Sequence, residues 1–209
     1  RLGGHDPYSN SKACAELAID SYRRSFFSGV GTAAVASARA GNVIGGGDWA
    51  VDRLVPDLVR AAVAGKPLVL RNPKSTRPWQ HVLEPLSGYL MLAQRLRDER
   101  ARYAEAWNFG PLDDADRTVE DIVALAARGW GESLKWVVDA GPQPHETRTL
   151  KLDCSKAASV GWRPLLRVDQ AVDWTIEWYR AWRDKRDVKG LTFEQIERYS
   201  RLMAGGRSA

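Results

Sequence analysis

The 209-residue sequence has little cysteine and little histidine. It contains two cysteines and three histidines, and Cys14 and Cys154 stand far apart with no Cys-x-x-Cys pair. This spacing offers neither the ligands of a zinc site nor a disulfide framework, and it suits a reducing compartment. We therefore expect no metal site and a cytoplasmic location.

Long apolar runs, charge runs and repeats are also missing. No apolar stretch reaches the roughly 18 residues of a membrane span, and the first residues do not resemble a signal peptide. The 31 basic and 26 acidic residues, which give a net charge of +5, are mixed through the chain. Nucleic-acid binders usually carry a Lys/Arg run or interleaved aromatics instead. We expect no membrane and no nucleic-acid partner, and the excess positive charge favours a smaller anion such as a nucleotide.

The chain has enough apolar residues for a real core, since 44% of it is hydrophobic and 9% aromatic.

Secondary structure can be predicted from local patterns. Thr118 and Asp121 have the spacing of a helix capping box. Hydrophobic periodicity predicts helices over 8–27, 53–64, 82–96, 118–130, 168–182 and 191–203, and strands over 32–38, 67–70, 106–109, 134–138 and 149–152. This alternation predicts an α/β fold: the later part of a Rossmann-type parallel sheet plus a small α/β lobe.

Two side chains at the start of the first predicted helix indicate hydride chemistry. Tyr8 and Lys12 are four positions apart and so share a helical face. An ammonium beside a phenol favours loss of the phenol's proton, which readies the tyrosine as a base. The same lysine can hold the ribose of a nicotinamide cofactor. From spacing alone, an exposed tyrosine and lysine without a function is an open alternative.

Three segments give that pair a context. Residues 4–16 read GHDPYSNSKACAE, residues 39–49 read RAGNVIGGGDW, and residues 71–85 read RNPKSTRPWQHVLEP. With these segments the chain resembles the extended short-chain dehydrogenase/reductase family of NAD-dependent epimerases and dehydratases, and within it the 4,6-dehydratases that act on CDP-glucose. The resemblance extends to about Trp182. It implies that 76–85 forms a diphosphate-binding turn.

The resemblance implies NAD as cofactor and CDP-glucose as substrate. Tyr8 takes the C4 hydroxyl proton while hydride passes from C4 to NAD⁺, and Lys12 supports Tyr8 and binds the nicotinamide ribose. Loss of water across C5 and C6 and return of the hydride to C6 then give CDP-4-keto-6-deoxyglucose, a precursor of deoxysugars for surface lipopolysaccharide. The Gly-rich dinucleotide fingerprint and the family's elimination residues before the tyrosine are absent. We therefore expect the later half of an enzyme, inactive alone.

The resemblance also assigns binding residues. The backbone at Ala40 faces the nicotinamide carboxamide, the Asn42 amide meets the diphosphate, and Arg77 can grip the diphosphate with two parallel hydrogen bonds. The other matched positions are Arg53 and Leu54 at the nucleotide, Val69 and Arg71 at the base, and Asn108 and His145 at phosphate and ribose, with Glu146 and Arg148 as weaker candidates.

Simpler roles stay open for several of these residues. Asn42 could end its strand by bonding its own turn, Arg53 could be a solvated first-turn residue, and Arg77 could form a surface ion pair. We assign packing roles to Trp79 and His81, to the loop 45–47, and to the tryptophans at 174, 178 and 182.

We expect three regions: the end of a dinucleotide-binding domain over 1–50, a mainly nucleotide-sugar-binding lobe with some returning sheet elements over 51–190, and a C-terminal helix and tail over 191–209. The family resemblance implies a homodimer through the Tyr–Lys helix. Two rival functions remain. One is another nucleotide-sugar epimerase or dehydratase, and the other is a non-catalytic nucleotide-sugar-binding or dimerising module.

Overall fold

The computed structural model describes residues 3, 6–111, 116–131, 134–139, 141 and 149–205. The chain divides into two compact units. Unit 1 comprises Arg1–Arg39, Leu86–Phe109 and Cys154–Trp162, and unit 2 comprises Ala40–Pro85, Gly110–Asp153 and Arg163–Ala209. No helix among the described residues is both long enough and apolar enough to cross a membrane.

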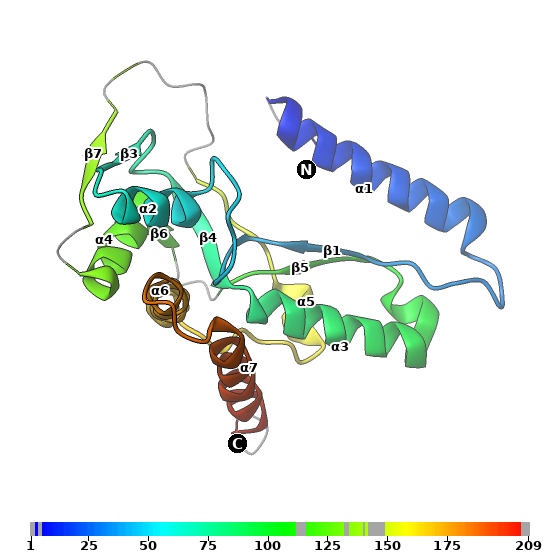
Figure 1. The fold of residues 1–209 in the computed structure, drawn as a ribbon. Helices are drawn as coiled ribbons and strands as arrows, with labels where there is room; N and C mark the ends of the chain where they lie inside the picture. The colour runs from blue at the N-terminus through cyan, green and yellow to red at the C-terminus, as the bar shows by residue number, and fades with distance from the viewer. Residues whose placement is uncertain are drawn as a thin grey trace. The chain divides into compact units, whose positions relative to one another are not determined.

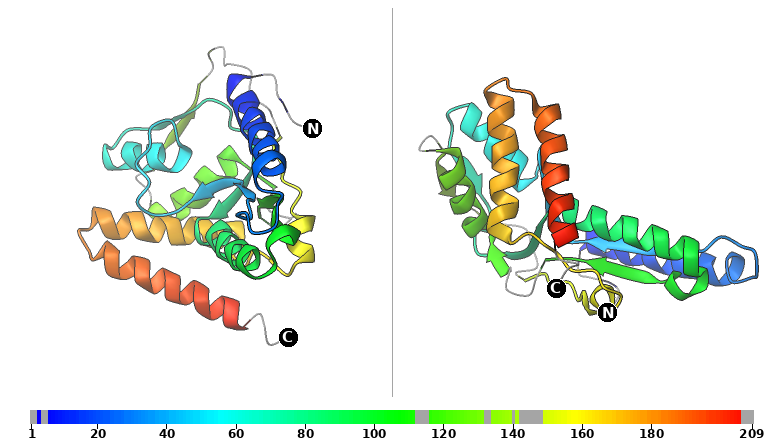
Figure 2. Two further views of the ribbon diagram at one scale, coloured as in Figure 1. Left: turned by 90° about the vertical axis from the view of Figure 1, so that its right-hand side faces the viewer. Right: turned by 90° about the horizontal axis from the view of Figure 1, so that it is seen from below.

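Unit 1 is built around two paired strands, β1 (Ser37–Ala40) and β5 (Ala106–Phe109). The pair runs between helix α1 (Pro7–Phe26) and helix α3 (Leu83–Glu99), as Figures 1 and 2 show. A short 3-10 helix, η1 (Arg100–Tyr103), and helix α5 (Ser155–Ser159) complete the unit. Its core consists of Leu92, Tyr103, Trp107, Phe109, Ala157 and Trp162.

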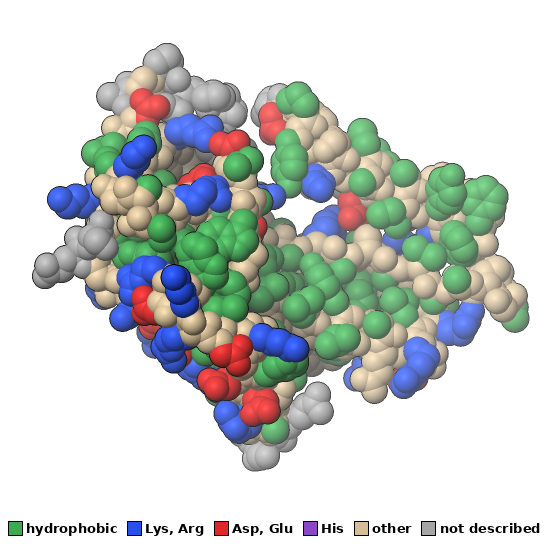
Figure 3. Space-filling model, in the orientation of Figure 1, with side chains coloured by type: hydrophobic (Ala, Val, Ile, Leu, Met, Phe, Trp, Pro, Cys, Tyr) green, Lys and Arg blue, Asp and Glu red, His purple; other side chains and the backbone are tan. Residues whose placement is uncertain are grey.

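Helix α1 begins where the sequence caps it. The Asp6 carboxylate accepts a hydrogen bond from the Ser9 backbone amide at 2.9 Å, and Pro7 occupies the first turn. That bond lowers the pKa of Asp6, so the cap stays ionised. Ala13 is the one buried residue of α1, and Figure 3 shows hydrophobic side chains exposed along the helix. Packing therefore holds α1 only lightly.

Unit 2 holds the larger core. Strand β4 (Thr76–His81) pairs in parallel with β2 (Asn42–Ile44) and antiparallel with β6 (Asp116–Thr118), while β3 (Leu68–Leu70) pairs in parallel with β7 (Trp136–Val138). Its helices are α2 (Leu54–Val63), α4 (Val119–Trp130), α6 (Val168–Arg183) and α7 (Val188–Gly205). Helix α6 lies between α4 and α7 (Figure 2). Side chains from α2, α4 and α6 form one continuous core with the strands.

The six helices expected from periodicity are all present, and the Thr118–Asp121 capping box is confirmed. The strands differ more. The turn expected over 76–85 was wrong, because residues 76–81 form β4, most of which is buried, and α3 begins at Leu83. The expected strand over 149–152 was also wrong, since only Thr149 makes an isolated bridge, to Thr76. Strand β1 starts later than expected and β2 was not foreseen.

Candidate functional site

Tyr8 and Lys12 lie together on the first turns of α1. The Lys12 Nζ atom stands 5.3 Å from the centre of the Tyr8 ring, and 67% of Tyr8 is exposed. The Ser11 hydroxyl donates to the Tyr8 carbonyl at 2.7 Å, within the same turn. The expected shared face is therefore present, and both reactive groups are open to a ligand.

Helix α1 is tied to β1 through Glu16. The Ser37 hydroxyl donates to the Glu16 carboxylate at 2.9 Å, and the Arg39 guanidinium lies 3.7 Å from the same oxygen. Arg39 directly precedes Ala40, the residue expected to face the nicotinamide. Glu16 thus links the Tyr–Lys helix to the strand that ends at Ala40.

Asn42 and Arg77 belong to neighbouring strands. Asn42 starts β2 and stands in register with Trp79 of β4, two residues after Arg77. The chain before β2 approaches β4 so closely that a Cβ on Gly41 would lie 2.4 Å from the Pro78 carbonyl oxygen. This approach requires glycine at position 41, and the next residue, Asn42, lies beside β4.

Arg77 is only 8% exposed, and its Nη1 donates to the Thr76 carbonyl at 2.9 Å. The guanidinium is therefore buried rather than solvated. Its predicted contact with a diphosphate stays a prediction.

Asp52 links Arg71 to the start of α2. The Arg71 Nη2 atom donates to the Asp52 carboxylate at 2.8 Å, and Asp52 precedes Arg53, the N-cap residue of α2. The Arg53 side chain is exposed and makes no capping hydrogen bond, whereas Leu54 packs against the core. Sequence reasoning missed Asp52, whose only signal is its position beside Arg53.

Val69 sits between buried Leu68 and Leu70 and is itself 55% exposed. It stands in register with Val137 on β7, which is also exposed. The outer face of this two-stranded sheet therefore offers an apolar surface directly before Arg71. That combination of an apolar face and a guanidinium suits a nucleobase, which presents both a ring face and polar edges.

Asn108 lies in β5 of unit 1, where it is half-buried. His145 lies outside the described residues, as do Glu146 and Arg148.

Trp79 and His81 are buried, at 5% and 2% exposure. The Trp79 indole donates to the Arg117 carbonyl at 3.3 Å, and the His81 ring meets the Trp174 ring edge-on, with 5.7 Å between centres. Burial lowers the pKa of His81 to about 4, so its ring is neutral near pH 7. The packing role expected for both residues is confirmed.

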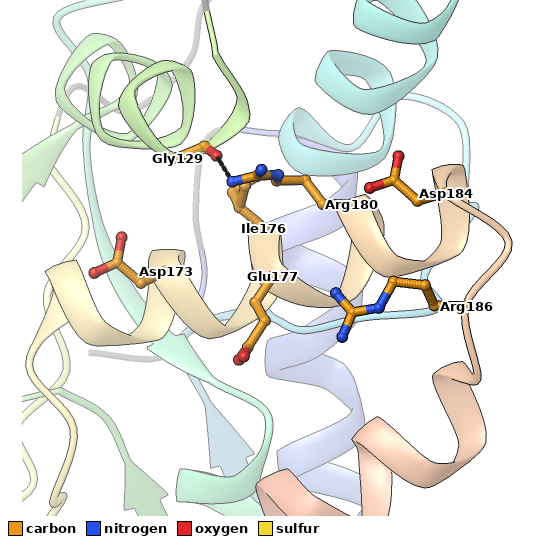
Figure 4. A pocket seen from close by; sticks show the side chains of 7 residues that line it. All are labelled: Gly129, Asp173, Ile176, Glu177, Arg180, Asp184 and Arg186. Carbon is orange, nitrogen blue, oxygen red and sulfur yellow. Dashed lines mark hydrogen bonds between the residues drawn. The ribbon is translucent and has the colours of Figure 1, made fainter.

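Two cavities beside α6 are lined by residues other than those predicted for the site. A cavity of about 360 Å³ is lined by Gly129, Asp173, Ile176, Glu177, Arg180, Asp184 and Arg186, as Figure 4 shows. Another, of about 320 Å³, shares Asp173 and Glu177. No residue predicted for the site lines either cavity. Within the described part of the chain, no cluster of three or more His, Cys, Asp or Glu side chains could hold a metal ion.

Comparisons with known proteins extend this picture. The chain is 48% identical over 206 residues to the CDP-glucose 4,6-dehydratase of Salmonella typhimurium, a match covering 95% of this chain and 56% of that protein. It is 27% identical over 187 residues to the dTDP-glucose 4,6-dehydratase of Haemophilus influenzae, covering 83% of this chain and 51% of that protein. The chain thus spans about half the length of the curated relatives it matches.

Solved structures share the fold. The dTDP-glucose 4,6-dehydratase of Streptomyces venezuelae, solved with NAD, matches with a TM-score of 0.70 at 24% identity over 90% of this chain and 55% of that one. The UDP-glucuronic acid 4-epimerase of Bacillus cereus matches with a TM-score of 0.69 at 18% identity over 84% of this chain and 52% of that one. The expected α/β fold is confirmed.

The description of the family model that matches residues 2–110 is "NAD dependent epimerase/dehydratase family". With that match and the 48% identity to a curated dehydratase, the chain belongs to the NAD dependent epimerase/dehydratase family.

Proposed function

We propose that this chain serves the NAD-dependent dehydration of CDP-glucose to CDP-4-keto-6-deoxyglucose. The observation that carries the proposal is the 48% identity to a CDP-glucose 4,6-dehydratase over 95% of the chain. Identity to the dTDP-glucose enzyme of Haemophilus influenzae is only 27%. This difference favours a cytidine nucleotide over a thymidine one.

Tyr8 is the base that takes the proton of the C4 hydroxyl group. Its phenol is exposed, and Lys12 stands beside it on the same face of α1. The lysine ammonium favours the phenolate and offers donors to a ribose. These two groups fit the nicotinamide ribose end of NAD. When bound, NAD⁺ would accept the hydride from C4 and, in its reduced form, return that hydride to C6.

The nucleotide sugar is held by cationic and amide side chains. Arg77 and Asn42 on adjacent strands suit the diphosphate, and Arg71, next to the exposed Val69, suits the base. A guanidinium keeps its charge at any working pH and can donate two parallel hydrogen bonds to phosphate. The remaining contacts proposed for the ligands are Ala40, Arg53, Leu54, Asn108 and His145.

We also infer a homodimer formed through α1 and a cytoplasmic location. Leu17, Tyr22 and Phe26 are each more than half exposed, at 57%, 61% and 64%. A second copy of the helix would remove this apolar surface from water. Sedimentation of the full-length protein tests this inference, because a monomer at all concentrations contradicts it.

The test of the activity uses the full-length natural protein with NAD⁺ and CDP-glucose that carries deuterium at C4. The expected product is lighter by one water and carries the deuterium at C6. A product of unchanged composition would indicate an epimerase, and no product with CDP-, UDP- or dTDP-glucose would indicate a binding module. A faster reaction with dTDP-glucose than with CDP-glucose would overturn the nucleotide assignment.

A further inference from the structure

The loop 45–53 connects β2 to α2 and ends at Asp52 and Arg53. It contains Gly45, Gly46 and Gly47, and an unsupported loop of this composition would sample many conformations. In the structure, however, side chains of α6 and α2 bind the loop backbone at residues 48, 49 and 50. The contacts that do so come from Tyr179 of α6, 131 positions away in sequence, and from Arg60 of α2.

Helix α6 holds the middle of the loop. The Tyr179 hydroxyl donates to the Asp48 carbonyl at 2.5 Å, across 131 positions of sequence. The ring of Trp49 meets the Tyr179 ring edge-on, with 5.3 Å between centres, and the Trp182 ring at a tilt of 55°, with 4.5 Å between centres. A Cβ on Gly46 would lie 2.1 Å from the Trp178 ring, so the loop backbone rests directly on that indole.

Helix α2 holds the next two carbonyl groups. Arg60 donates from Nη1 to the Trp49 carbonyl and from Nη2 to the Ala50 carbonyl, both at 3.0 Å. The Asp48 carboxylate also accepts from the Ala50 amide at 2.9 Å. Three successive carbonyl oxygens, those of residues 48, 49 and 50, therefore each accept a hydrogen bond from a helix side chain.

The end of the loop is held in a restricted conformation. Asp52 has a φ of +58°, a region that non-glycine residues occupy mainly where the surroundings impose it. In this conformation its carboxylate reaches Arg71. The Tyr179 phenol is fully buried, and burial raises its pKa to about 12, so the phenol keeps its proton and donates throughout the working pH range.

We propose that Tyr179 is a positioning residue for nucleotide binding: its bond to the Asp48 carbonyl fixes loop 45–53, so that Arg53 and the Asp52-held Arg71 are ordered before the nucleotide arrives. The inference rests on the proposed function, in which Arg53 and Arg71 contact the nucleotide. Its physical basis is that a site ordered in advance does not lose that ordering free energy on binding.

Removal of one hydroxyl group tests the inference. Tyr179→Phe keeps the ring against Trp49 but leaves the Asp48 carbonyl without its donor. In the full-length protein we expect a roughly 2- to 10-fold weaker Kd for CDP, the effect of a single net hydrogen bond. The KM for CDP-glucose rises with it, and kcat stays unchanged, because Tyr8 and Lys12 are untouched. In the nucleotide-free protein, the amide hydrogens of residues 48–53 should exchange faster in Tyr179→Phe than in the wild type.

A second buried phenol provides the control. The Tyr199 hydroxyl donates to the buried Glu84 carboxylate at 2.8 Å, so Tyr199→Phe removes a comparable bond away from the loop. We expect this variant to keep the wild-type Kd for CDP. Arg60→Gln, which releases the carbonyls of Trp49 and Ala50, should weaken CDP binding as Tyr179→Phe does.

The possible results distinguish the positioning role of Tyr179 from the proposed function on which it rests. Wild-type protein that binds no CDP refutes the proposed function. Wild-type protein that binds CDP, with an unchanged Kd in both Tyr179→Phe and Arg60→Gln, refutes only the positioning role. An equal loss of affinity in Tyr199→Phe also refutes it, because the effect would then be one of general stability.

Discussion

Helix α1 carries the residues proposed for the chemical step and loop 45–53 leads to residues proposed for nucleotide binding, and the two segments are held in place by different kinds of contact. Tyr8 and Lys12 are brought together by the repeat of a single helix that buries only Ala13. Asp52, which pairs with Arg71, lies near the end of a loop that α6 and α2 hold through hydrogen bonds to three of its carbonyl groups. Local helix geometry thus places the pair proposed for the chemistry, whereas tertiary packing places residues proposed to contact the nucleotide.

From this contrast we expect substitutions in the two regions to have different effects. Substitutions in the exposed pair should change the chemical step with little effect on folding. Substitutions around the loop should change stability or nucleotide affinity with little effect on the chemical step.

The largest effect is expected from Tyr8→Phe in the full-length protein. Loss of a positioned general base lowers kcat by about 10²- to 10⁴-fold. Because 67% of Tyr8 is exposed, Tm should stay at the wild-type value. Tyr22→Phe is the matched control, since Tyr22 is 61% exposed on the same helix and should keep full kcat. Equal turnover in the two variants contradicts the assignment.

The second effect concerns the pH dependence of the unit 2 core. Burial lowers the pKa of His81 from 6.5 to about 4, so the unfolded chain binds this proton at a higher pH than the folded chain does. The free energy of unfolding therefore falls as pH falls from about 6.5 to about 4. At about 1.4 kcal/mol per pKa unit, the His81 contribution to that fall is about 3 kcal/mol.

His81→Asn isolates that contribution. The Asn amide oxygen can replace Nδ1, which accepts from the Leu83 amide at 3.4 Å, but it has no proton to gain. Burial raises the pKa of Glu84, which gives the opposite slope above about 4.5, and this term is common to both proteins. Urea denaturation at pH 7 and pH 4 should show a smaller loss in the variant. Equal losses in the two proteins contradict the prediction.

The third effect tests the close approach of the loop to α6. In Gly46→Ala the new methyl group would meet the Trp178 ring at 2.1 Å, and overpacking of this kind costs about 1–3 kcal/mol. The Tm should fall accordingly. A Cβ on Gly29 would meet its nearest neighbour at 3.5 Å, an ordinary contact, so Gly29→Ala should leave Tm near wild type. A similar Tm for both variants would mean that the loop does not rest on Trp178.

The smallest effect is expected from Asp52→Asn. The Asp52–Arg71 pair is largely exposed, and such pairs contribute about 0.2–1 kcal/mol. Loss of the pair should raise the KM for CDP-glucose at most about fivefold, with kcat unchanged. Glu120→Gln breaks another exposed pair, with Lys74 at 2.7 Å, and should leave KM unchanged. A lower kcat in Asp52→Asn would contradict a role limited to binding.

The sequence predicted those parts of the molecule that depend on local pattern. The helices follow from periodicity, the capping box at Thr118 from its spacing, and the contact of Tyr8 with Lys12 from the helical repeat. Each of these features depends on residues within a few positions of one another. Recognition of the family added the surrounding assignments, which no local pattern could supply.

The features that sequence reasoning missed depend on distant partners. Strand β4 includes Arg77, Gln80 and His81, which are polar yet buried, so no apolar alternation marks it as a strand. The role of the Tyr179 hydroxyl group depends on an acceptor that lies 131 positions away in sequence. The positive φ of Asp52 could not be predicted either, because its partner Arg71 is 19 positions away in sequence.

The most direct test of the separation between chemistry and binding is a calorimetric titration of full-length Tyr8→Phe with CDP-glucose. We expect this variant, despite its low kcat, to bind CDP-glucose with the Kd of the wild-type protein, because the side chains proposed to bind the nucleotide are separate from Tyr8. Loss of binding together with turnover would contradict it, because Tyr8 would then be part of the nucleotide-sugar site itself.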